Sequence, residues 1–206
     1  VALSAAFRRN DGFNISDEGS EKDGDRNLTL NGKVNIEVTP DLKLDGTLRF
    51  VDRASDVDPQ GFDGIVHDAD DTVETRELFG SVGATHTSLD GALTQRARLT
   101  GSDIRREGWE NGGLGYAYDG DRLNASYQAS YEFDTPSFLG AKHVLTGGYE
   151  WEQERFLANH LTATESRTTN SFVAEYRGEY LDQFHLTAAV RHDINDDFKD
   201  ATTYSL

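Results

Sequence analysis

Two acidic segments carry the side chains with the clearest capacity for chemistry. Residues 10–26 and residues 52–74 each combine several Asp and Glu side chains with Gly. Ca²⁺ is a hard cation that takes about six to eight oxygen ligands, so clustered carboxylates of this kind suit it. Neither segment has the ligand spacing of an EF-hand. The segments therefore indicate either an irregular calcium site or a solvated acidic surface.

Other catalytic and ligating patterns are weak. The six histidines include no closely spaced pair of the zinc-protease type, and Cys is absent, which excludes disulfides and thiol chemistry. The acidic run 68–71 places no acid and base around a cleft. The glycine-rich segment 111–115 is not followed by Lys-Ser/Thr, which favours a loop over a phosphate site. We therefore expect a protein that is not an enzyme.

Three aromatic residues suggest a recognition surface. Trp109, Tyr116 and Tyr118 fall within residues 102–119, which we interpret as a long polar loop. Exposed aromatic side chains often form binding surfaces, so these three are candidate ligand contacts. The competing interpretation is that they cap the ends of strands.

The elements that must position these residues are strands. Between residues 28 and 38, Leu, Gly, Val and Ile occupy the even positions, and polar residues occupy the odd ones. Side chains of a strand alternate between its faces, so this segment predicts a strand with one apolar and one wet face. We expect about ten such strands, at residues 1–9, 28–38, 42–50, 77–87, 92–101, 123–133, 143–156, 172–180, 184–190 and from Thr202.

Composition agrees with strands that cross a membrane. A hydrophobic content of 36% is too low for helical membrane spans. The strands of a membrane barrel alternate apolar and polar residues, so they show little bulk hydrophobicity. The net charge of −17 argues against nucleic-acid binding. The N-terminal residues lack the pattern of a signal peptide, and we expect the chain to be cut from a longer protein.

The links between strands alternate in length. Short links are expected at 39–41, 88–91, 134–141 and 181–182, and long polar ones at 10–26, 52–74, 102–119 and 157–168, with a shorter one at 194–200. This alternation is typical of antiparallel up-and-down transmembrane β-barrels. Aromatic girdles are then expected at both membrane interfaces. Outer-end members are Phe7, Phe50, Trp151 and Phe172, and inner-end members are Tyr131, Phe133 and Tyr180. The charged opposite face predicts a wide, hydrated or plugged lumen.

Several short motifs resemble those of TonB-dependent outer-membrane receptors. Residues 145–152 resemble a strand of that family, and Arg191-His192-Asp193 followed by Phe198 resembles its R-x-D…F element. The order and spacing of the motifs carry the resemblance over nearly the whole chain. Motifs similar to the vitamin B12 receptor branch are residues 7–13, 49–53 and 74–79.

The resemblance implies that residues 1–206 are part of a roughly 22-stranded barrel, without its plug domain, TonB box and C-terminal strands. It also implies a Gram-negative outer membrane, uptake of cobalamin or a ferric siderophore, and partnership with the lipid bilayer, the plug domain and TonB. Calcium orders the outer loops of the receptors resembled. The matching candidates by position are Asn14, Asp23, Asp25, Asp58 and Glu74.

Two other functions fit the same residues. One is a stand-alone small barrel of the outer membrane, either a porin or an enzyme. The other is a soluble, calcium-binding β-domain of a surface adhesin. A second protein layer pressed against the apolar rows would favour the adhesin and exclude a membrane wall.

Overall fold

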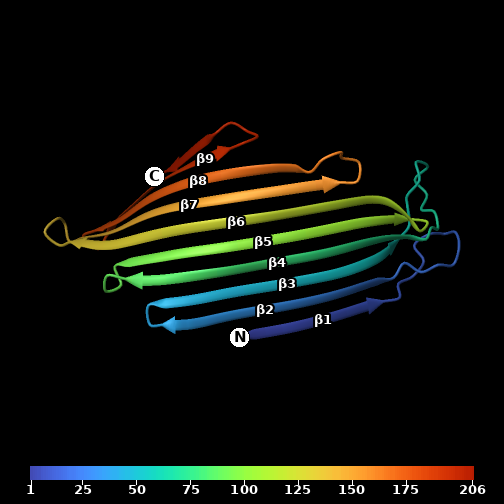
Figure 1. Cartoon of the computed structure of the whole chain (residues 1–206), viewed down its shortest axis with the longest axis horizontal. Coiled ribbons are helices and arrows are strands. Elements are labelled where there is room, and N and C mark those ends of the chain that lie inside the picture. Colours follow the sequence, from blue (N-terminus) through green and yellow to red (C-terminus); the bar gives the residue numbers. More distant parts are fainter.

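The computed structural model describes residues 1–206 as one open, curved sheet of ten antiparallel strands (Figure 1). Each strand pairs only with its neighbours in the chain, in the order β1 to β10. This confirms the predicted all-β, up-and-down arrangement. The strands are β1 Ala2–Asn10, β2 Asp25–Thr39, β3 Leu42–Val57, β4 Asp71–Ser88, β5 Leu93–Glu110, β6 Gly113–Thr135, β7 Ala141–Ala158, β8 Glu165–Tyr180, β9 Phe184–Asn195 and β10 Ala201–Ser205.

The sheet is a single layer, with no second layer of protein over either face (Figure 1). Only 10 of the 206 residues are buried, and large apolar side chains such as Leu48 and Val82 are 56% and 60% exposed. A soluble β-sandwich would bury these rows between two sheets. The molecule therefore has the architecture of a wall and lacks a packed core.

Strand register separates the side chains into two faces. Val82 of β4 pairs with Leu99 of β5, which pairs with Ala125 of β6, and their side chains form one apolar row. We call the face that carries this row the apolar face and the opposite one the polar face. On the polar face, Arg98 donates a hydrogen bond to Asp45 across β4 at 2.7 Å. Alternation along each strand thus places hydrocarbon on one side and ion pairs on the other.

The links gather at two ends of the sheet (Figure 1). At the short-turn end they are 40–41, 89–92, 136–140 and 181–183. At the opposite end, here called the long-loop end, they are 11–24, 58–70, 111–112, 159–164 and 196–200. The predicted division by length fails at 111–112, and 196–200 is no longer than 136–140 at the opposite end; the other links follow it. No helix in this structure has the length and apolar character needed to cross a membrane.

The prediction of a long loop over 102–119 is wrong. Strands β5 and β6 continue through this segment and meet at the turn Asn111-Gly112, whose φ angles are 49° and 77°. Positive φ at both positions is the requirement of a type I′ hairpin turn, and Asn-Gly meets it best. The face that is apolar elsewhere is polar here; Arg105, for example, lies 2.6 Å from Glu107 on it. Backbone pairing therefore continues where the apolar alternation has ended.

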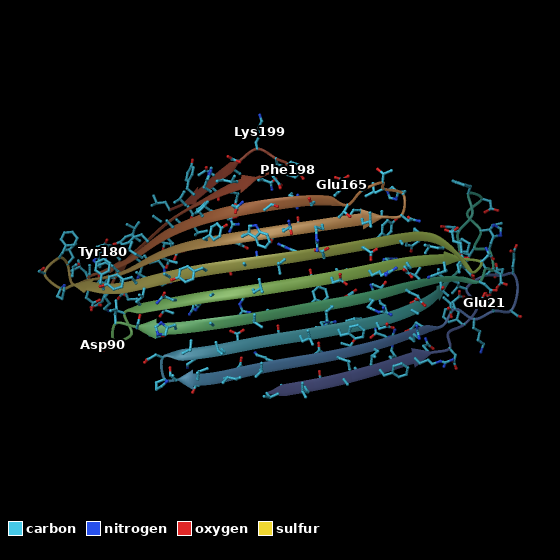
Figure 2. All side chains as sticks on the ribbon, viewed as in Figure 1. Glu21, Asp90, Glu165, Tyr180, Phe198 and Lys199 are labelled. Atoms are coloured by element: carbon cyan, nitrogen blue, oxygen red, sulfur yellow. The ribbon has the colours of Figure 1, made fainter.

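Aromatic side chains form a cluster on the apolar face at the short-turn end. Phe133 stacks on His143 with ring centroids 4.7 Å apart, and Tyr131 stacks on Phe133 at 5.7 Å. The hydroxyl of Tyr176 lies 2.7 Å from His143 Nδ1 and also bonds Tyr180, which Figure 2 labels at this end. The three residues predicted for the inner girdle thus belong to one bonded cluster, and His143 completes it.

Candidate functional site

The two acidic loops, 11–24 and 58–70, pack against each other at the long-loop end, where Figure 2 labels Glu21. The buried Ser16 hydroxyl donates to the Val66 carbonyl at 2.8 Å, which ties one loop to the other. Gly19 has a φ of +68° and lies so close to the Asp68 carboxylate that any Cβ would overlap it. The positive φ favours glycine at this position, and a side chain here would displace the Asp68 carboxylate.

Three carboxylates from these loops form a group that we call the loop carboxylate cluster. Glu21, Asp58 and Asp68 each place an oxygen within 4.8 Å of the others. One oxygen of Asp58 accepts a hydrogen bond from the Ala69 N–H at 3.1 Å, whereas the other is buried without a partner. Burial, followed by the charges of Asp70 and Asp68, raises the pKa of Glu21. A cation among these oxygens would offset both the repulsion and the missing partner.

Two of the predicted calcium ligands lie in or beside this cluster. Asp58 is one of its members. Asp23 lies close enough for its charge to contribute to the raised pKa of Glu21. One Asp23 oxygen accepts from the Ile15 N–H at 2.9 Å, and the other is buried without a partner. Both residues therefore offer an unused oxygen in the same region.

The structure places the other three candidates elsewhere. Asn14 is used locally, since its side chain bonds the Ser16 N–H and the Glu18 carbonyl. Asp25 pairs with Ser55 and Glu74 with Ala54, so Asp25 and Glu74 are on opposite faces of the sheet. Arg8 donates to Asp25 at 2.7 Å, and Arg26 lies 3.8 Å from Glu74.

Glu21 and Asp68 were not singled out from the sequence. Both lie in the predicted acidic segments, but so do many other carboxylates. The packing of one loop on the other decides which of them meet, and no local spacing reports that packing. The only indication of these two residues in the sequence is that they lie in two acidic loops at the same end of the sheet.

The candidate aromatic contacts lie on strands rather than in a loop. Tyr116 and Tyr118 of β6 have ring centroids 5.2 Å apart, and Tyr118 stacks on Phe156 of β7 at 6.1 Å. Trp109 follows a bulge after Gly108 and does not belong to these stacked pairs. Its indole nitrogen is buried without a partner. The structure thus joins two of the candidates and adds Phe156, which sequence reasoning missed.

The polar face carries a hydrogen-bonded network across β6 to β9. Glu150 accepts from Asn124 at 2.7 Å and from Arg191 at 3.2 Å. Arg191 also donates to Asp193 and to the buried Ser171 hydroxyl, each at 2.8 Å. The Arg-x-Asp motif of the sequence thus supplies an ion pair on the face predicted to line a lumen.

A histidine links the two acidic loops through contacts with carboxylates. His67 Nδ1 lies 3.2 Å from Glu18 and Nε2 lies 3.5 Å from Asp63. The hydrogen bond to Glu18 and the charges of both carboxylates raise the pKa of His67. A raised pKa in the folded state means that this contact stabilises the loops fully at low pH and loses its effect as pH rises through the raised pKa.

We expect amide hydrogen exchange of residues 11–24, corrected for its intrinsic pH dependence, to become faster as pH increases from about 6 to 8.5, a range that spans the ordinary His titration. The His67→Gln variant should exchange at the faster rate throughout and show no such transition. A transition of equal size in His67→Gln would assign the pH dependence to another group.

Of three comparisons with known proteins, the one with solved structures finds similar folds. No protein-family model and no curated protein matches the chain. Among solved structures, the siderophore receptor PirA from Pseudomonas aeruginosa matches 87% of this chain with a TM-score of 0.70 and 19% identity. The outer membrane transporter YddB from Escherichia coli matches 97% with a TM-score of 0.71 and 10% identity.

A third similar structure is the ferric enterobactin receptor PfeA from Pseudomonas aeruginosa, with a TM-score of 0.61, 16% identity and 90% of this chain covered. The chain spans 29%, 32% and 31% of the lengths of PirA, YddB and PfeA. At these identities the likeness establishes the fold. The chain has the fold of a segment of barrel wall of the outer-membrane receptor type.

Proposed function

We propose that this chain is part of the barrel of a TonB-dependent receptor in the outer membrane of a Gram-negative bacterium. The receptor takes up a scarce, bulky nutrient, either a ferric siderophore or cobalamin. Its action is not catalytic: the outer loops capture the ligand, and TonB acts on the plug domain of the full protein. The names of the similar structures support the siderophore branch, whereas the short motifs of this sequence support the B12-like branch.

The division between the two faces of the sheet carries this proposal. The apolar face exposes rows such as Val82, Leu99 and Ala125, which suits contact with lipid. The polar face holds ion pairs such as Arg191–Asp193, which suits a hydrated lumen or a polar plug. A small closed barrel filled by its own side chains has no room for so many charges on its inner face.

The single layer weighs against the two alternative functions. A soluble adhesin domain would cover the apolar rows, and a stand-alone barrel would join β1 to β10, whereas these strands form the two edges of the open sheet. Unpaired edges are not tolerated within a bilayer, which supports a larger barrel in which β1 and β10 pair with further strands.

We further propose that the outer loops bind Ca²⁺ through the loop carboxylate cluster, with Asp23 beside it. The unpartnered buried oxygens of Asp23 and Asp58 and the raised pKa of Glu21 support a cation at this position. Binding would hold loops 11–24 and 58–70 together over the ligand entrance.

The receptor function is tested with the full protein that contains this chain, produced in cells with and without TonB. We expect the cells to bind either labelled cobalamin or a labelled ferric siderophore in both backgrounds. Uptake should require TonB, because energy reaches the plug through it. Correctly inserted protein that binds neither ligand class would contradict the proposal.

A further inference from the structure

A pocket of about 620 Å³ opens on the polar face where β4 to β8 approach the long-loop end. The link 196–200 borders it, and Figure 2 labels Glu165 and Phe198, which come from β8 and from this link. None of the residues singled out from the sequence as ligand contacts lines this pocket. It adjoins those candidates through Phe156, which stacks on Tyr118, and forms a further candidate site in the same wall.

The floor of the pocket is formed by a glycine between two apolar side chains. Gly120 of β6 pairs with Ile104 of β5 on one side and with Phe156 of β7 on the other. A Cβ at Gly120 would meet only the Arg155 carbonyl, at 3.9 Å, so the glycine leaves space without being required by the backbone. Ile104, Phe156 and Phe198 thus offer apolar surface around a depression.

The guanidinium groups of the pocket are already neutralised. Glu154 accepts a hydrogen bond from Arg167 Nε at 3.0 Å and lies 3.9 Å from Arg122 Nε. Arg122 also pairs with Glu152. On the polar face the lining contains three carboxylates (Glu154, Glu165 and Asp197) against two guanidiniums, and Glu165 belongs to none of these ion pairs. The pocket therefore has little free positive charge to offer a ligand.

The opposite face at the same positions shows where the pocket lies relative to lipid. Asp121 and Arg155, the neighbours of Gly120 and Phe156 along the chain, form an ion pair at 2.9 Å on the apolar side of the sheet. Charged side chains are unfavourable against hydrocarbon, so this part of the sheet extends beyond the hydrocarbon layer on the long-loop side. The pocket is thus accessible from the external medium.

Building on the receptor function proposed above, we propose that this pocket binds an uncharged or cationic ligand that presents apolar surface, and that it disfavours polyanions. The apolar surface of Ile104, Phe156 and Phe198 contributes affinity through burial. A polyanion meets carboxylates without gaining free guanidinium partners, because Glu154 already pairs with Arg122 and Arg167. The charge of a ligand therefore decides whether this pocket binds it.

The test uses the purified full receptor and three kinds of probe: an uncharged or cationic ferric tris-hydroxamate, uncharged cyanocobalamin, and a polyanionic ferric tris-catecholate. Dissociation constants are measured by quenching of intrinsic fluorescence. We expect one of the first two probes to bind at least about tenfold more tightly than the tris-catecholate. We expect Gly120→Leu to weaken that binding by about tenfold or more, which corresponds to about 1.4 kcal/mol.

Gly101→Leu is the matched control. Gly101 lies on the apolar face of β5, where a Cβ would meet only Leu123 and the Arg122 carbonyl at 3.8 and 3.9 Å. The Gly101→Leu variant should bind the ligand as tightly as the wild type. Glu154→Gln releases the guanidinium of Arg167, while Arg122 keeps its partner Glu152, and we expect the variant to strengthen tris-catecholate binding several-fold.

Three outcomes would overturn the inference. Wild-type preference for the tris-catecholate would contradict the charge selectivity. Equal binding by wild type and Gly120→Leu, with the variant inserted normally, would show that the ligand lies elsewhere or that the plug fills the pocket. Both of these outcomes leave the receptor function standing, whereas a failure to bind any probe would overturn the receptor function as well.

Discussion

Replacing Leu99 with Arg should destabilise the membrane-inserted receptor by about 2–4 kcal/mol, the cost of a cationic side chain on the lipid face near the bilayer midplane. Leu99 is 44% exposed, and its row on the apolar face includes Val82 and Ala125. In a barrel this exposed surface contacts hydrocarbon, which cannot solvate a guanidinium. The measurement is the urea midpoint for folding of the full receptor in lipid vesicles.

Thr100→Arg is the control for this experiment. Thr100 pairs with Ser81 and Asn124 on the polar face, one position along the chain from Leu99. A guanidinium there faces the side that already holds ion pairs, so the folding midpoint should change little. Equal destabilisation by both variants would contradict the assignment of the two faces, and with it the position of the sheet in a membrane.

Calcium should have the second large effect. If Ca²⁺ binds the loop carboxylate cluster, a concentration about 100 times the dissociation constant stabilises the closed loops by about 2.7 kcal/mol. Hydrogen exchange of loops 11–24 and 58–70 should then slow by about two orders of magnitude, since about 1.4 kcal/mol corresponds to tenfold. Isothermal titration of the full receptor with Ca²⁺ measures the binding directly.

Two double variants distinguish the carboxylates that matter. Asp58→Asn combined with Asp68→Asn should abolish both the heat of binding and the slower exchange, because two charged ligands of the cluster are lost. Asp25→Asn combined with Glu74→Gln should leave both intact, since these residues pair with Arg8 and Arg26. The reverse pattern would show that Asp25 and Glu74, and not the loop carboxylate cluster, hold the ion.

The amino-acid sequence by itself determined the class of fold and the identity of the two faces. The alternation between residues 28 and 38 predicted a strand that the structure extends to Asp25–Thr39, and the other periodic segments likewise became strands. This information is local, because side-chain direction in a strand depends only on position along the chain. The exposed apolar face and the charged polar face followed from it.

Only the tertiary structure decided how far the strands extend and which distant side chains meet. Residues 102–119 lack apolar alternation, yet backbone pairing with neighbouring strands continues through them to the turn at Asn111. Asp25 and Glu74 lie on opposite faces because the pairing register of β2, β3 and β4 decides which face each side chain is on. Glu21 and Asp68 meet because two loops pack against each other. Register and loop packing join residues far apart in the chain, and no local pattern encodes them.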